Sequence, residues 1–184
     1  TDLPHMLPKK EVWGKIMSSL GINNNDDILI YDNSDLKSSC RLWFSLLYFG
    51  HDEKKIHILN GGLKKWIFEN KPITKLTTEI IKSNYVANEK ENLVVSFDQI
   101  KKNILSKSFN VIDARSLERF EGKVSEPRKG LRSGHIQNSF CLPFNQCINQ
   151  KTGEFKNLEE LRELFNQNEN IEKRLDQVFT CGSG

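Results

Sequence analysis

No stretch of the sequence approaches the roughly 18 consecutive apolar residues that a transmembrane helix needs. The sequence also has no basic run: the net charge is only +3, and the lysines are scattered through segments that contain asparagine and glutamate. Neither a membrane nor a nucleic acid is therefore indicated as a partner. The first residues carry no secretory signal pattern, so we expect a soluble cytoplasmic protein, with organellar targeting left open.

Closely spaced cysteines are missing as well. Cys40, Cys141, Cys147 and Cys181 lie far apart, without a CxxC pair and without histidines at metal-ligand spacing. No metal ion and no other cofactor is therefore indicated. A chain of 184 residues, of which 37% are hydrophobic, can bury a sizeable core without covalent cross-links, so we expect reduced thiols.

The sequence that is present alternates between helical and strand patterns. In the first half it predicts, in chain order, a helix over 9–20, a strand over 28–31, a helix over 41–49, a strand over 55–59 and a helix around Trp66. In the second half it predicts a helix over 96–105 capped by Ser96, a strand over 110–112, a helix over 158–165 and a strand over 177–180. In the first helix the apolar residues at helical spacing are Val12, Ile16, Met17 and Leu20. The alternation predicts an α/β fold in which mainly parallel sheets are flanked by helices.

Residues 71–93 show no sustained period and are predicted to connect two domains, formed by residues 1–70 and 94–184. Both halves contain a helix, an asparagine-rich loop and an apolar strand, which indicates a duplicated unit. Asp32 follows the strand of the first half at the place where Cys181 follows the strand of the second. Only the second half therefore offers a nucleophile.

Cys181 directly follows a predicted strand and precedes Gly182-Ser183-Gly184. Such a loop suits a tight turn whose backbone amides converge on one anion, and positive charge there would stabilise a thiolate or a persulfide. Cys181 is thus a candidate nucleophile. A buried structural cysteine beside an ordinary turn would give the same Cys-Gly-Ser-Gly sequence, and the residues alone leave both interpretations open.

The segment between Asp113 and His135 is rich in arginine. Its four arginines are Arg115, Arg119, Arg128 and Arg132. Arginine presents a planar fork of donors that matches a carboxylate, so arginines that converge near a thiolate would suit an anionic sulfur donor. Alternatively, these arginines are surface groups paired with Glu118, Glu121 and Glu126, or Arg115 is a structural partner of Asp113.

Several short strings follow one another in a fixed order along the chain. In the first half they are His5-Met6-Leu7-Pro8, Ile30-Tyr31-Asp32, Arg41-Leu42-Trp43, Phe49-Gly50-His51-Asp52 and Leu59-Asn60-Gly61-Gly62-Leu63. In the second half they are Asp113-Ala114-Arg115, Arg119-Phe120, Glu126-Pro127-Arg128, Ser133-Gly134-His135-Ile136, Leu142-Pro143-Phe144 and Thr180-Cys181-Gly182-Ser183-Gly184. Together they resemble the tandem-domain rhodanese family of sulfurtransferases over nearly the whole chain. The last string reads as in the 3-mercaptopyruvate branch, whereas thiosulfate enzymes usually place cationic side chains after the cysteine.

The resemblance implies a sulfurtransferase with an inactive first domain and a catalytic second domain. Cys181 would take sulfur from 3-mercaptopyruvate, a small anionic donor, as a persulfide and release pyruvate. A thiol such as thioredoxin or a low-molecular-weight thiol, or cyanide, would then accept the sulfur.

The resemblance also implies roles for other residues. Ser183 and His5 would relay protons, although the upstream aspartate of that relay has no counterpart in this sequence. The donor would be bound by Arg119, Arg128, Gly182 and Gly184.

Two departures from the family pattern are visible. The run His135-Ile136-Gln137-Asn138-Ser139 replaces the usual His-Ile-Pro-Gly-Ala, so a Pro-Gly turn is lost and a structural effect alone is expected. The chain also begins just before the family's His-Met-Leu-Pro and stops inside the active-site loop, so both domains are expected to be incomplete. Activity of this stretch alone is therefore in question.

Three other functions stay open. Thiosulfate is the alternative donor, because the same arginines would attract it. A non-catalytic rhodanese-like binding module would use the anion loop to recognise a partner or ligand. A phosphatase with the same cradle would be expected to have a longer loop and an arginine after the cysteine.

Overall fold

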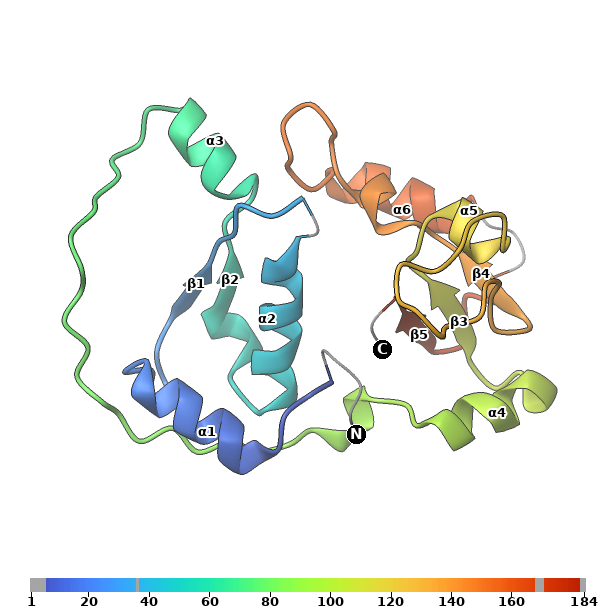
Figure 1. Ribbon diagram of the computed structural model, residues 1–184, viewed down its shortest axis with the longest axis horizontal. Coiled ribbons are helices and arrows are strands. Elements are labelled where there is room, and N and C mark those ends of the chain that lie inside the picture. Colours follow the sequence, from blue (N-terminus) through green and yellow to red (C-terminus); the bar gives the residue numbers. More distant parts are fainter. Residues whose placement is uncertain (1–5, 36, 168–170, 183–184) are drawn as a thin grey trace. The chain divides into compact units, whose positions relative to one another are not determined.

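The computed structural model describes residues 6–35, 37–167 and 171–182. These residues form two compact units (Figure 1). The N-terminal unit comprises Leu7–Val94 together with the loop Lys151–Glu154, and the C-terminal unit comprises the rest of the described chain. Within the described ranges, none of the helices combines the length and apolar character that crossing a membrane requires.

The N-terminal unit contains a two-stranded parallel sheet and three helices among its described residues. In chain order its elements are α1 (Lys10–Ser19), β1 (Ile28–Ile30), α2 (Ser38–Tyr48), the 3-10 turn Glu53–Lys55, β2 (Ile56–Ile58), α3 (Gly62–Phe68) and the 3-10 turn Glu91–Leu93. Ile28 lies opposite Ile56 in the sheet, and α2 runs alongside both strands (Figure 1). The predicted order of helices and strands is confirmed for this half, with ends shifted by a few residues.

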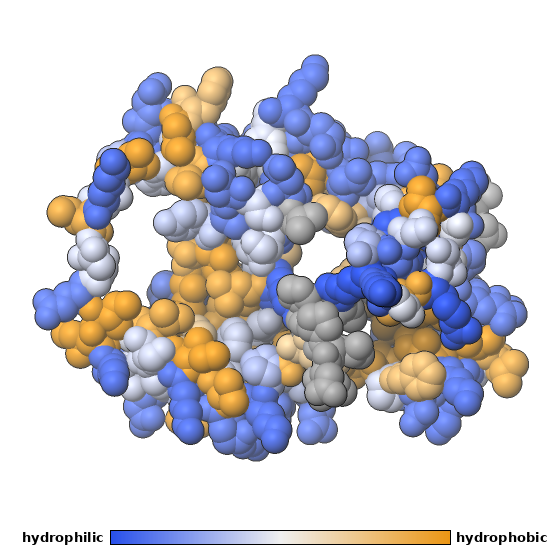
Figure 2. Space-filling model, viewed as in Figure 1, coloured by the Kyte–Doolittle hydropathy of each residue, from blue (hydrophilic) through white to orange (hydrophobic). Residues whose placement is uncertain are grey.

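The core of this unit is built around an aromatic pair. Trp13 of α1 stacks on Phe49, with ring centroids 4.7 Å apart. Met17 is also buried, and α1 ends where Gly21 adopts φ +73°, a conformation that glycine tolerates well. The other three apolar residues at helical spacing, in α1 and directly after it, stay about half exposed, and apolar surface is visible over this unit in Figure 2. They are Val12, Ile16 and Leu20.

The segment between α3 and the turn at Glu91–Leu93 has no helix or strand, yet its second part is fixed to the N-terminal unit. The amide of Ser83 donates to the carbonyl of Ser18 at 3.0 Å, and the amide of Asn88 donates to the carbonyl of Phe49 at 2.9 Å. Since buried backbone groups need such partners, these bonds hold the segment against α1 and the end of α2.

The C-terminal unit has a three-stranded sheet in the order β4-β3-β5, and all its strands are parallel. In chain order its elements are α4 (Phe97–Ser106), β3 (Asn110–Asp113), α5 (Leu117–Phe120), β4 (Ser139–Cys141), the 3-10 turn Phe144–Cys147, α6 (Leu158–Asn166) and β5 (Gln177–Thr180). Every residue of β3 is buried, as expected for the central strand of a covered parallel sheet.

Both longer helices of this unit begin with a capping box. Ser96 accepts from the amide of Gln99 at 3.3 Å, and the Gln99 side chain accepts from the amide of Ser96 at 2.7 Å. Asn157 and Glu160 form the same reciprocal pair at the start of α6. These side chains satisfy amides that would otherwise lack partners, so the predicted Ser96 cap is confirmed.

The strand β4 follows the run that departs from the family pattern. Asn138 adopts φ +64°, and its side-chain amide donates to the carbonyl of Ile104 at 2.9 Å. Asparagine tolerates this left-handed conformation better than most residues, so it turns the chain into β4 without a Pro-Gly pair.

Candidate active site

The candidate site lies where β3 and β5 end. Asp113, the last residue of β3, lies opposite Thr180, the last residue of β5. The amide of Ala114 donates to the carbonyl of Thr180 at 2.8 Å and prolongs the pairing by one residue. Because parallel strands end at the same edge of a sheet, Arg115 and Cys181 emerge there together.

Cys181 is exposed at this edge, and two arginines reach the residue that follows it. Nη1 of Arg128 donates to the carbonyl oxygen of Gly182 at 3.1 Å. Nη2 of Arg119 lies so close that a Cβ added to Gly182 would come within 2.6 Å of it. The fold therefore brings both predicted donor-binding arginines to the Cys181 loop.

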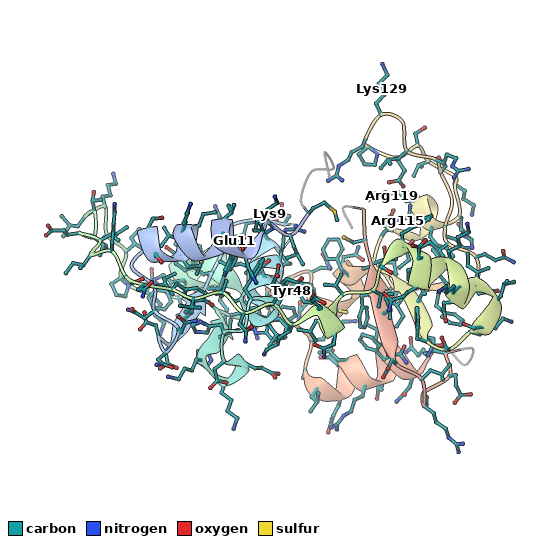
Figure 3. All side chains as sticks on the ribbon, turned by 90° about the horizontal axis from the view of Figure 1, so that it is seen from below. Lys9, Glu11, Tyr48, Arg115, Arg119 and Lys129 are labelled. Atoms are coloured by element: carbon teal, nitrogen blue, oxygen red, sulfur yellow. The ribbon has the colours of Figure 1, made fainter. Side chains whose placement is uncertain are left out.

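An ion-pair network lies beside these arginines. Arg115 donates to both carboxylate oxygens of Asp113 at 2.6 to 3.0 Å, and its Nη1 donates to Glu126 at 2.8 Å. Arg119 donates to the same Glu126 from Nε at 3.1 Å and from Nη2 at 2.5 Å. The side chains of Asp113 and Glu126 are only 2% and 3% exposed. Figure 3 shows Arg115 and Arg119 next to each other.

These contacts favour the charged forms of Arg115 and Glu126. Hydrogen bonding to Asp113 raises the pKa of Arg115 above its ordinary value, against the opposing effect of burial. Hydrogen bonding from Arg119 lowers the pKa of Glu126 below its ordinary value, although burial alone would raise it. Two carboxylates balance two guanidiniums, whereas Arg128 forms no ion pair with any of the described residues.

The two interpretations of the arginine-rich segment each hold for different residues. Arg115 is a buried partner of Asp113, as the structural interpretation expected. Arg132 is exposed. His135 stacks on Phe120 with ring centroids 3.8 Å apart, and its Nδ1 lies 2.7 Å from the Phe120 carbonyl, so this nitrogen carries the hydrogen. His135 therefore holds the end of the loop that follows α5 against Phe120, the last residue of that helix.

Glu126 is the member of the site that sequence reasoning did not single out. The sequence patterns point to it as a surface partner for arginines and as part of the string Glu126-Pro127-Arg128, whereas its side chain is buried between two arginines. The available signal was an acidic residue inside a stretch with four arginines, because a buried cluster of guanidiniums needs compensating charge.

Comparison with known proteins finds one family match and several similar sulfurtransferases. Residues 3–69 match the family described as Rhodanese-like domain. The chain is 38% identical to thiosulfate/3-mercaptopyruvate sulfurtransferase 2 of Arabidopsis thaliana, over 100% of this chain and 59% of that protein. It is 34% identical to 3-mercaptopyruvate sulfurtransferase of Homo sapiens, over 98% of this chain and 60% of that protein. The chain contains a rhodanese-like domain.

A solved structure agrees with this assignment. The crystal structure of SseA from Escherichia coli, described with the rhodanese fold of 3-mercaptopyruvate sulfotransferases, matches with a TM-score of 0.87 at 29% identity. The match covers 100% of this chain and 67% of SseA. The predicted α/β fold, with parallel sheets flanked by helices, is confirmed as the rhodanese fold. The chain spans about 59 to 60% of the length of the two curated relatives named above.

Three residues to which the rhodanese resemblance assigned roles lie outside the described residues: His5, Ser183 and Gly184. Their roles stay predictions. Of the seven predicted site residues, the structure describes Cys181, Gly182, Arg119 and Arg128, and it groups these four at one edge of the sheet.

The remaining cysteines are thiols in partly buried positions. Burial raises the pKa of Cys40, Cys141 and Cys147 above the ordinary value of a thiol. Since the thiolate is the nucleophilic form, these three cysteines are poorer nucleophiles at neutral pH than an ordinary cysteine. Cys181 differs from them because it is exposed.

Proposed function

We propose that this protein is a sulfurtransferase that carries sulfane sulfur from 3-mercaptopyruvate to a thiol or cyanide through a persulfide on Cys181. The observation that carries the proposal is the convergence of Arg119 and Arg128 on Gly182, directly after an exposed cysteine. Relatives named as 3-mercaptopyruvate sulfurtransferases support the choice of donor.

The proposed reaction has two steps. The Cys181 thiolate attacks the sulfur of the donor, the carbon–sulfur bond breaks, and its electron pair passes to the enolate, which takes up a proton to give pyruvate. The acceptor then attacks the outer sulfur of the persulfide, the sulfur–sulfur bond breaks, and the thiolate is restored. No net redox partner is needed when cyanide or a thiol takes the sulfur.

The arginines supply charge recognition in this scheme. Arg119 and Arg128 bind the carboxylate and carbonyl of the donor through charge-assisted hydrogen bonds. The backbone of Gly182 and Gly184 forms the anion loop, and Ser183 with His5 relays protons. In this scheme Arg128, whose charge the buried carboxylates leave uncompensated, sets the positive potential that attracts an anionic donor.

The proposed architecture is a tandem of rhodanese-like domains, with an inactive domain over 1–70, a connection over 71–93 and a catalytic domain over 94–184. The carboxylate of Asp32, which lies two residues after the end of β1 much as Cys181 directly follows β5, supports this assignment. It accepts from the amide of Ser39 at 2.7 Å and from Ser38 Oγ at 3.2 Å. An acidic side chain that is bonded in this way is a poor sulfur carrier, which fits an inactive first copy.

The proposed acceptors are thioredoxin, a low-molecular-weight thiol or cyanide. The cytoplasm is the proposed compartment, with an organelle as the alternative, since one relative is named as mitochondrial. Thiosulfate is the second candidate donor because the first relative's name includes it.

The test is pyruvate release from 3-mercaptopyruvate, measured beside sulfur transfer from thiosulfate, in the full-length protein and its Cys181→Ser variant. Cys147→Ser, a partly buried thiol, is the matched control. We expect a strong preference for 3-mercaptopyruvate, an inactive Cys181→Ser variant and an active control. If thiosulfate is preferred, the donor assignment changes. If neither donor reacts, a non-catalytic binding module becomes the better description.

A further inference from the structure

Glu126 connects two arginines of very different surroundings. Its Oε1 accepts from Nη1 of Arg115 and from Nε of Arg119, and its Oε2 accepts from Nη2 of Arg119. The Glu126 side chain is 3% exposed, while those of Arg115 and Arg119 are 10% and 24% exposed. Glu126 therefore lies between an inner arginine and an outer one.

The inner arginine is anchored to the sheet. Arg115 donates to both carboxylate oxygens of Asp113, the buried last residue of β3, and its Nη2 also donates to the carbonyl of Gly134 at 2.7 Å. Charge-assisted bonds with good geometry on both sides fix the guanidinium. Through Arg115, the carboxylate of Glu126 is held at a defined place relative to the end of β3.

Among the described residues, the side chain of the outer arginine, Arg119, donates hydrogen bonds to Glu126 alone. Arg119 belongs to α5, which is a single turn of four residues, Leu117–Phe120. Such a short helix gains little stability of its own, and a long arginine side chain loses considerable rotamer entropy when it is fixed. The two bonds to Glu126 supply that constraint and leave Nη2 beside Gly182.

We propose that Glu126 is a positioning residue that holds Arg119 against the Cys181 loop and determines which of its donors face the sulfur donor. Nε and one hydrogen of Nη2 are directed to Glu126, so Arg119 meets the donor with Nη1 and the other Nη2 hydrogen. A lysine at position 119 has a single nitrogen and cannot keep this geometry with both partners.

This inference rests on the proposed function and extends it to a residue behind the binding groups. It is tested by a double-mutant cycle in the full-length protein, with Glu126→Gln, Arg119→Ala and the combination of both. We expect Glu126→Gln to lower kcat/KM for 3-mercaptopyruvate by about 10- to 100-fold, because a misplaced binding group loses transition-state contacts. In the Arg119→Ala background, Glu126→Gln should lower kcat/KM by less than about threefold, because Glu126 acts through Arg119.

Controls separate a positioning role from a general structural one. Glu118→Gln changes an exposed acid in the same short helix and should leave kcat/KM within about twofold of the parent. A structural role would make Glu126→Gln equally harmful with and without Arg119, and that result would overturn the proposal. If Glu126→Gln does not fold, Glu126→Asp, which keeps the charge on a shorter side chain, is put through the same cycle.

The failure of this inference differs from the failure of the proposed function. If Arg119→Ala lowers turnover while Glu126→Gln has no effect, the sulfurtransferase assignment stands and the positioning role is wrong. If the parent protein turns over no sulfur donor at all, the proposed function falls and the positioning role for that reaction falls with it.

Discussion

Nη1 of Arg128 donates a hydrogen bond to the carbonyl oxygen of Gly182, 54 residues further along the chain, at 3.1 Å. Arg128 lies on the loop that links α5 to β4, and Lys129 marks the outer tip of that loop in Figure 3. The bond therefore connects a long surface loop to the residue after Cys181, and it brings the positive charge of Arg128 to that residue.

Replacing Arg128 should weaken donor binding more than stability. We expect Arg128→Ala to lower kcat/KM for 3-mercaptopyruvate by about 10- to 100-fold, the range for losing a hydrogen bond to a charged group. Steady-state pyruvate release measures the effect. Arg132→Ala is the matched control, because Arg132 lies exposed on the same loop. Equal losses in the two variants would contradict a specific role for Arg128.

Gly182→Ala should impair turnover while the protein stays folded. The backbone of Gly182 does not adopt the left-handed conformation that favours glycine, but the added Cβ would come within 2.6 Å of Nη2 of Arg119, which is bonded to Glu126. Arg119 should therefore move aside at a cost of about 1 to 3 kcal/mol in stability, because its bonds to the buried Glu126 are disturbed. The measurements are thermal unfolding and kcat/KM. In the Arg119→Ala background the substitution should be nearly neutral, and a large loss there would show that Arg119 is not the affected group.

The elements that sequence patterns predicted best are those whose signals are local. The start of the helix at Ser96 is marked by a capping box with Gln99, a residue only three positions away. The strand before Asp113 is a short apolar run, and its burial on both faces follows from its place at the centre of a parallel sheet. Such features depend only on residues that are close to one another in the sequence.

Features that depend on distant partners escaped the same reasoning. In α1 the buried residues include Trp13 because Phe49 offers it a stacking partner, whereas Val12 and Ile16 face outward although they are apolar. Similarly, Glu126 is buried because Arg115 and Arg119 converge on it from two elements. Composition identified the arginines as a group, but only the fold shows that Arg115 builds the network, that Arg128 reaches Gly182 and that Arg119 does both.

Asp32 should make the stability of the N-terminal unit depend on acid pH. Burial alone would raise the pKa of Asp32, but hydrogen bonds from Ser39, Ser34 and Ser38 outweigh it and hold the pKa below its ordinary value. The stabilisation is thus complete above the unfolded pKa of about 3.9 and is lost as pH falls through the lower folded pKa. Asp32→Asn should lower the free energy of unfolding by about 1 kcal/mol at neutral pH. The difference in unfolding free energy between this variant and the parent should shrink as pH falls below the unfolded pKa of about 3.9.

Unfolding midpoints between neutral pH and pH of about 3 test the effect of Asp32. The matched control is Asp35→Asn in the same loop, because the Asp35 side chain is 90% exposed in its ion pair with Lys64. A pH-independent difference between the parent and the Asp32→Asn variant would contradict the assigned role of the carboxylate.

The hydroxyl of Tyr85 should stabilise the N-terminal unit through a buried histidine. Nε2 of His51 lies 2.9 Å from the Asp26 carbonyl, which can only accept, so in neutral His51 the bare Nδ1 accepts from the Tyr85 hydroxyl at 3.3 Å. His51 is 0% exposed and Tyr85 4%, so water cannot replace the lost donor. Tyr85→Phe should therefore cost about 1 to 3 kcal/mol, measured by denaturant unfolding. Tyr31→Phe, at a position 59% exposed, should cost almost nothing, and equal costs would mean that the hydroxyl of Tyr85 is not needed by His51.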